Sequence, residues 1–160
     1  MEKMKLEELP SFAQKVLLQL PETKSQAVIV ALQGDLGAGK TTFVQALARE
    51  LGVTQTVQSP TYVLMKKYDI SYRSFTSLIH IDAYRLNNPA EFAALKPENF
   101  LKDPQVLVCI EWPEKVLGAL PEPDITLKLS LTPDVSNGAG TPQEDLPAQA
   151  GERYIEITTV

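Results

Sequence analysis

Cysteine is almost absent from this sequence of 160 residues, in which Cys109 is the only one. An internal disulfide is therefore excluded, which suits a reduced cytosolic setting, and Cys109 is expected to be a small core residue inside its apolar run. Long apolar stretches are lacking too, since no run reaches the ~18 residues of a membrane span and the first residues carry mixed charge. Secretion and membrane insertion are disfavoured, and a cytoplasmic location without a membrane partner is expected.

Basic residues are scarce: there are 15 Lys and Arg against 20 Asp and Glu, which gives a net charge of −5. A broad basic face that binds nucleic acid unaided is therefore not expected, so any RNA connection would run through a partner. Apolar residues make up 44% and charged residues 22% of the chain, as in ordinary globular domains. The length suits a single domain over residues 1–160 with its own core.

Apolar periodicity predicts alternating helices and strands. Unbroken apolar runs predict strands covered on both faces, spacings of three and four predict packed helices, and strict alternation predicts strands with one solvated face. The two alternating strands are expected to pair antiparallel at one sheet edge, and a Pro- and Gly-rich stretch over 132–152 is expected to be a flexible connector. The predicted helices cover 11–20, 41–51 and a short segment from Pro89; the predicted strands cover 27–32, 62–68, 75–82, 106–110, 125–131 and 154–160.

A glycine-rich stretch follows the first buried-type strand: Gly34-Asp35-Leu36-Gly37-Ala38-Gly39-Lys40-Thr41. It matches the phosphate-loop pattern, in which glycines let successive backbone N–H groups point at phosphate oxygens, Lys40 bridges the outer phosphates and the Thr41 hydroxyl binds Mg²⁺. The helix that leaves the loop adds the positive end of its dipole. We therefore expect an α/β, P-loop nucleotide-binding fold with a central, mostly parallel sheet, antiparallel edge strands and flanking helices.

Such a site also needs a carboxylate for the metal and a group that orients the attacking water. Glu111 closes the strand over 106–110, where P-loop sites hold an acidic residue; an ordinary solvated charge at a strand end is the alternative. Asp82 closes the strand over 75–82, and alternation puts His80 on the same face, so the two side chains could share one polar site. His80 is the only histidine and could equally be a satisfied structural residue.

Two further segments have open interpretations at this point. Trp112, the only tryptophan, follows Glu111 directly and is by default a core or interface aromatic. Ser59-Pro60-Thr61 could sense the outermost phosphate as a switch loop does, or could form a plain proline turn.

Four blocks within residues 6–131 together resemble the TsaE (YjeE) family. They are Gly34-Asp35-Leu36-Gly37-Ala38-Gly39-Lys40-Thr41-Thr42-Phe43, Ser59-Pro60-Thr61-Tyr62, His80-Ile81-Asp82-Ala83-Tyr84-Arg85 and Glu111-Trp112-Pro113. The resemblance implies a small ATPase needed for the threonylcarbamoyl modification of adenosine 37 (t6A37) in bacterial tRNAs that read codons beginning with A. It also implies a TsaB–TsaD pair as protein partners, in which TsaD carries out the transfer, tRNA is reached only through that complex, and ATP hydrolysis resets the assembly.

The resemblance assigns expected roles residue by residue. Lys40 would hold the phosphates, Thr41 and Glu111 would hold Mg²⁺, and Asp82 would act near the metal or the water. Trp112 would lie beside the site. The expected catalytic residues are Lys40, Asp82, Glu111 and Trp112; the expected ATP-binding residues are Gly34, Asp35, Leu36, Gly37, Ala38, Gly39, Lys40, Thr41 and Thr42; Ser59 and Thr61 are the expected switch-like residues, and His80 is a further candidate.

Two departures and two alternatives limit this interpretation. Many relatives have a glycine after the short helix that follows Tyr84-Arg85, where this chain has Ala93-Ala94-Leu95-Lys96-Pro97, and the 132–152 stretch is longer and more polar than expected. A small-molecule kinase would use the same loop, but it should have an arginine-bearing lid, which four arginines and no basic lid segment argue against. A nucleotide-dependent binding module, in which ATP only stabilises a docking shape, remains open.

Overall fold

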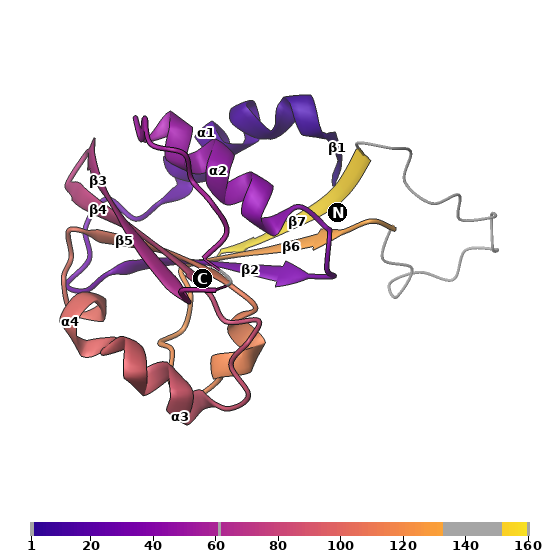
Figure 1. Ribbon diagram of the computed structural model, residues 1–160. Coiled ribbons are helices and arrows are strands. Elements are labelled where there is room, and N and C mark those ends of the chain that lie inside the picture. Colours follow the sequence, from indigo (N-terminus) through magenta and orange to yellow (C-terminus); the bar gives the residue numbers. More distant parts are fainter. Residues whose placement is uncertain (1, 61, 133–151, 160) are drawn as a thin grey trace.

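The computed structural model describes residues 2–60, 62–132 and 152–159 (Figure 1). Of the connector predicted over 132–152, residues 133–151 lie outside this described part, as does Thr61. In chain order the elements are β1 (Glu2–Lys5), η1 (Leu6–Glu8), α1 (Leu9–Gln19), β2 (Val28–Gly34), α2 (Lys40–Glu50), β3 (Met65–Tyr72), β4 (Phe75–Asp82), α3 (Pro89–Phe92), η2 (Ala93–Leu95), α4 (Glu98–Leu101), β5 (Val106–Glu111), η3 (Pro113–Val116), β6 (Ile125–Ser130) and β7 (Glu152–Thr159).

The described strands form one seven-stranded sheet in the order β1-β7-β6-β2-β5-β4-β3. In its centre, β2 pairs parallel with both β5 and β6, and β5 pairs parallel with β4. Towards the edges, β3 pairs antiparallel with β4, β7 with β6, and β1 with β7. The predicted α/β fold with a mostly parallel centre and antiparallel edge strands is thus confirmed.

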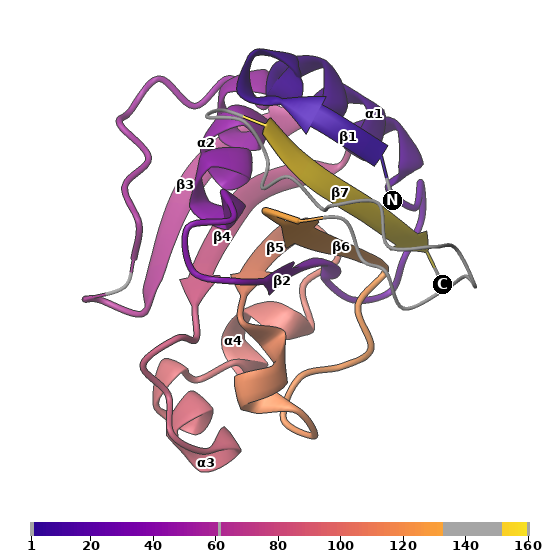
Figure 2. The ribbon, with the colours of Figure 1, turned by 90° about the vertical axis from the view of Figure 1, so that its right-hand side faces the viewer.

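Helices cover both faces of the sheet (Figures 1 and 2). The helices α1 and α2 lie on one face, and the short helices α3 and α4 lie on the other. The central strands are apolar on both sides because each face is covered, and alternate residues of β5 belong to different cores: Cys109 faces α1 and α2, whereas Val108 and Ile110 face the short helices. Among the described residues, no helix is long and apolar enough to cross a membrane.

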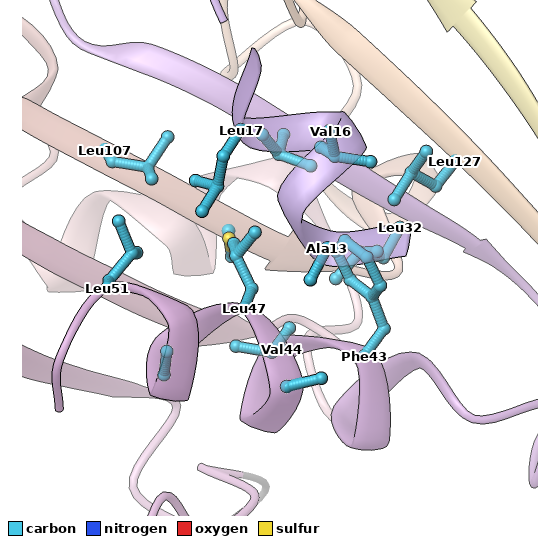
Figure 3. Packing of buried hydrophobic residues seen from close by; sticks show 14 of the residues in the cluster. Ala13, Val16, Leu17, Leu32, Phe43, Val44, Leu47, Leu51, Leu107 and Leu127 are labelled. Atoms are coloured by element: carbon cyan, nitrogen blue, oxygen red, sulfur yellow. The ribbon is translucent and has the colours of Figure 1, made fainter. Parts of the chain in front are cut away.

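The larger core joins α1 and α2 to the central strands (Figure 3). The predicted apolar face of the helix after the loop is buried there, and Phe43 meets Phe12 of α1 edge-on with ring centroids 5.8 Å apart. Each fully buried side chain of this size stabilises the fold by about 1.5–3 kcal/mol. This packing fixes α2, and with it the glycine loop, against the sheet.

Several details differ from the sequence predictions, among them the helix α4, which was not predicted. The strand predicted from Tyr62 begins at Met65, because the Pro60 carbonyl accepts hydrogen bonds from the backbone N–H groups of Val63 and Leu64 and closes a turn. The N-terminal strand β1 was not predicted, since only Met4 of its four residues is buried. It pairs with β7, so the antiparallel β6–β7 pair is not itself the sheet edge.

The turn after the short helices α3 and η2 has an unusual backbone conformation. Lys96, which follows η2, adopts a left-handed conformation with φ of 50°. Glycine takes this conformation without steric cost, whereas a residue with a Cβ atom is strained in it. This turn is therefore locally strained at Lys96.

Candidate nucleotide site

The glycine loop joins the end of β2 to the start of α2 and approaches the neighbouring strand closely. Gly34 has φ of 122°, and a Cβ atom built there would lie 1.8 Å from the carbonyl oxygen of Leu129 in β6. Gly39, at the N-cap of α2, has φ of 100° and provides no side-chain cap. The first N–H groups of α2 therefore point at the loop opening, where an anion is favoured.

Lys40 begins α2 and lies beneath an aromatic ring. Its ammonium Nζ donates to the backbone carbonyl oxygens of Gly34 at 2.7 Å and Asp35 at 2.8 Å. The same atom lies 3.8 Å from the ring centroid of Trp112, and the whole side chain is buried. Burial lowers the pKa of Lys40, and the nearby Glu111 carboxylate is the main group that opposes this shift.

Glu111 ends β5 next to the start of α2. The Thr41 hydroxyl Oγ1 donates to both carboxylate oxygens, at 2.8 Å to Oε1 and 3.0 Å to Oε2. His80 of β4 approaches from the other side, with its Nε2 atom 2.8 Å from Glu111 Oε1. Glu111 and His80 are both buried, so the alternative of a solvated charge at a strand end does not hold for Glu111.

Asp82 ends β4 and pairs in register with Glu111, so the two carboxylates lie at the same edge of the sheet. Asp82 is buried; its Oδ1 accepts from the backbone N–H of Tyr84 at 3.0 Å, and the Ser59 hydroxyl lies 3.4 Å from its Oδ2. The parallel strands β2, β4 and β5 all end here, which is where ligands bind in open α/β sheets.

Trp112 follows Glu111 in a left-handed conformation with φ of 60°, which is unusual for a residue with a Cβ atom. Its backbone N–H donates to the carbonyl oxygen of Leu32 at 3.1 Å, and its ring lies 5.2 Å, centroid to centroid, from that of Tyr84. The strained backbone turns the indole back over Lys40. Trp112 is thus a wall of the site, and its partly buried side chain also packs against the smaller core.

These groups surround one cavity of about 300 Å³. Most of the residues predicted for the site line it, together with Tyr84, whose role was not predicted although it lies in one of the four sequence blocks. The lining residues are Leu36, Gly37, Gly39, Lys40, Thr41, Thr42, Ser59, Asp82, Tyr84, Glu111 and Trp112.

Four other predicted residues that the structure describes, Gly34, Asp35, Ala38 and His80, are not part of this lining. Gly34 and Asp35 supply the carbonyl oxygens that bind Lys40, and Ala38 is fully buried. His80 lies behind Glu111 rather than at the cavity wall, although it and Asp82 do share one face of β4 as alternation predicted. The functional roles of all these residues stay predictions.

A parallel strand, a glycine loop and a helix that begins with Lys and Thr, set opposite an acidic strand end, define a nucleotide-binding protein of the P-loop class. The family model of "Threonylcarbamoyl adenosine biosynthesis protein TsaE" matches residues 4–137. The chain therefore belongs to the TsaE family.

Individual relatives agree with this assignment. The chain is 37% identical to the tRNA threonylcarbamoyladenosine biosynthesis protein TsaE of Haemophilus influenzae over 123 residues, which cover 77% of this chain and 74% of that one. It is 34% identical to the TsaE protein of Bacillus subtilis over 127 residues, 79% of this chain and 72% of that one. The crystal structure of Bacillus subtilis YdiB superposes with a TM-score of 0.64 at 25% identity, covering 99% of this chain and 86% of the other.

Proposed function

We propose that this protein binds ATP with Mg²⁺ and hydrolyses it to support the t6A37 modification of tRNA. The observation that carries the proposal is the meeting of Lys40, Thr41 and Glu111 at one cavity in a chain of the TsaE family. TsaB and TsaD homologues would be the protein partners, with tRNA reached only through their complex in the cytoplasm.

Phosphate binding would fall to the loop and to Lys40. The ammonium group is held by two carbonyl oxygens at 2.7 and 2.8 Å, so it is already at the mouth of the loop and can exchange these acceptors for phosphate oxygens. The first N–H groups of α2 would bind the same anion. Trp112 excludes water from one side of the ammonium group, which strengthens its interaction with phosphate charge.

The residues present fit Mg²⁺. Thr41 Oγ1 and the Glu111 carboxylate are hard oxygen ligands already side by side, and Mg²⁺ is usually held by one or two such groups together with substrate phosphates. Accordingly, the described residues contain no cluster of three or more His, Cys, Asp or Glu that would form an all-protein cage. When bound, Mg²⁺ would neutralise the phosphate charge that develops during transfer.

Asp82 would orient the attacking water. Its carboxylate is buried, lines the cavity and stands in register with Glu111, so a water molecule between Asp82 and the outermost phosphate would be held by a fixed acceptor. Ser59 lies next to Asp82, where a switch-like segment could respond to that phosphate. The Arg153 side chain of β7 lies beside Gly39 of the loop but is not among the residues that line the cavity, and P-loop enzymes often depend on an arginine at the phosphates for rapid turnover. We therefore expect slow hydrolysis by the protein alone.

Phosphate release measured with and without purified TsaB and TsaD homologues tests the proposal. Release should rise when the partners are added and should fall to background in Lys40→Ala and Glu111→Ala. Lys15→Ala, which removes an exposed lysine from α1, is the matched control and should behave as the wild type.

Each other result points to a different function. Normal turnover by Lys40→Ala would overturn the site assignment. A phosphorylated small molecule as product would indicate a kinase. Nucleotide-dependent assembly with the partners that persists without any turnover would indicate a binding module.

A further inference from the structure

His80 has a polar environment of an unusual kind. The imidazole is completely buried at the end of β4, and its Nε2 atom lies 2.8 Å from Glu111 Oε1. Its other nitrogen, Nδ1, is also buried and has no hydrogen-bond partner among the described residues. In the sheet, His80 lies in register with Cys109 of β5 and Lys66 of β3. Neither of these residues makes a hydrogen bond to Nδ1.

This environment decides which way the hydrogen bond runs. A carboxylate only accepts hydrogen bonds, so the proton in the short contact with Glu111 must lie on His80 Nε2. A proton placed on Nδ1 instead would be buried without an acceptor and would leave two lone pairs facing each other at Nε2, which is costly on both counts. His80 therefore donates to Glu111.

The bond fixes the orientation of the Glu111 carboxylate. Oε1 accepts from both His80 Nε2 and the Thr41 hydroxyl, each at 2.8 Å, whereas Oε2 has only the longer Thr41 contact of 3.0 Å. The histidine thus anchors one oxygen from inside the core. The other oxygen, Oε2, has one longer contact and is the oxygen more easily given to a ligand.

We infer that His80 is a positioning residue, which holds Glu111 so that Oε2, the oxygen that His80 does not contact, can bind the cation of a nucleotide–Mg²⁺ complex. The inference rests on the proposed function, because it requires that Glu111 binds Mg²⁺. His80 itself would contact neither the nucleotide nor the water. Groups that orient a metal-binding carboxylate typically change metal affinity or activity about 10- to 100-fold when they are removed. A histidine that served only core packing would alter stability without this effect.

The first test is spectroscopic and needs no variant. His80 is the only histidine of the chain, so the ¹⁵N signals of a uniformly labelled sample report its imidazole without overlap. We expect the proton on Nε2. A neutral ring with the proton on Nδ1 would overturn the inference, because such a ring cannot donate to Glu111.

The second test measures the affinity for β,γ-imido-ATP in Mg²⁺ and in EDTA. The quantity compared is the dissociation constant in EDTA divided by the dissociation constant in Mg²⁺, so a larger ratio means a larger gain from Mg²⁺. In His80→Ala the ratio should fall about tenfold while the affinity in EDTA stays unchanged. His80→Gln, whose side-chain amide can still donate, should recover part of the ratio. Leu78→Val, a core truncation on the same face of β4, is the control for packing and should leave the ratio unchanged.

A double substitution separates positioning from other effects. In a Glu111→Gln background, His80→Ala should lower the ratio no further, because the residue acts through Glu111. A wild-type protein without any Mg²⁺-dependent gain in affinity would contradict the proposed function itself. A normal gain in the wild type that persists undiminished in His80→Ala would contradict only the role of His80.

Discussion

The central parallel strands have a carboxylate at each end, partly buried at the amino end and buried at the carboxyl end, and the two are used differently. At the amino end, Asp124 precedes β6; its Oδ2 accepts from the backbone N–H of Ile29 at 2.8 Å, and Lys24 Nζ donates to both of its oxygens at 2.7 and 2.8 Å. The exposed fraction of the side chain is 20% for Lys24 and 14% for Asp124, so most of each is shielded from solvent. This carboxylate is neutralised by its own chain.

At the carboxyl end, the charged groups are held apart. Among the described residues, Lys40 Nζ donates to two backbone carbonyl oxygens and to no carboxylate, although Glu111 is close enough to affect its pKa. Glu111 takes its hydrogen bonds from Thr41 and His80. An ion pair made within the chain is a structural element, whereas a cation and a carboxylate kept separate around a cavity can each bind part of a ligand. Substitutions at the two ends should accordingly affect different measurements.

Gly34→Ala should have the largest effect, because the carboxyl end is built on a close approach of β2 to β6. The new Cβ atom would collide with the Leu129 carbonyl oxygen, and φ of 122° is itself unfavourable for alanine. We expect a loss of at least about 3 kcal/mol in the free energy of unfolding, measured by urea denaturation. Gly37→Ala is the control: it also has positive φ, but a Cβ atom there meets open space, so its loss should be clearly smaller. Equal losses would show that φ alone governs both positions.

Glu111→Gln tests the carboxyl end as a binding site. The change keeps the shape of the side chain but removes the charge proposed to bind Mg²⁺, so phosphate release should fall about 100-fold. The free energy of unfolding should change little, because the amide can still accept from His80 and Thr41. If the free energy of unfolding fell while the folded variant still released phosphate at the normal rate, Glu111 would be a structural group like Asp124.

Asp124→Asn is the matching change at the amino end and should give the opposite pattern. Loss of the charge that binds Lys24 should lower the free energy of unfolding by about 2 kcal/mol, as for a partly buried hydrogen bond between charged groups. Phosphate release at a temperature where the variant is folded should equal that of the wild type. A selective loss of activity in a fully folded Asp124→Asn would break the comparison between the two ends.

Cys109 lies in β5 between the two ends and gives the smallest effect. Burial raises the pKa of its thiol above the ordinary value of 9.0, so the native state disfavours the thiolate that the unfolded chain can form. The stability that the neutral thiol contributes is complete below about pH 9 and is lost as the pH rises beyond it. Measured by urea denaturation, the advantage of the wild type over Cys109→Ala should shrink by about 1 kcal/mol between pH 8 and pH 10. A constant difference would mean that Cys109 does not titrate on unfolding in this range.

Elements with a dense local signal could be predicted from the sequence. The helix after the loop buries Phe43, Val44 and Leu47 as its periodicity predicted. The short helix predicted from Pro89 begins there as α3, and the Asn88 side chain caps it by accepting from the Glu91 backbone N–H at 3.1 Å. The strand β1 gave no such signal, because a strand with one buried residue has no periodicity to detect. The turn at Pro60–Leu64 was not predicted either. The residues Tyr62 and Val63 favoured a strand from their type, although both side chains are exposed in the structure.

For the candidate site, how much could be predicted depends on how far apart its residues lie in the sequence. The phosphate loop is contiguous, so residue type and spacing along the chain already determined that strand, glycine loop and helix would follow one another and that Lys40 and Thr41 would lie at a helix start. Their positions at strand ends already made Asp82 and Glu111 candidates, and the resemblance to known relatives added Trp112 and the expected roles, but neither source gave their contacts.

Only the tertiary structure decided how the distant groups meet. The parallel pairing of β5 with both β2 and β4 brings Glu111 beside Thr41 and His80, which lie 70 and 31 residues away from it in the chain. The left-handed backbone at Trp112 then sets the indole over Lys40. These contacts depend on strand order and register, and both are fixed by burying two apolar faces of one sheet at once. No local stretch of sequence encodes that condition.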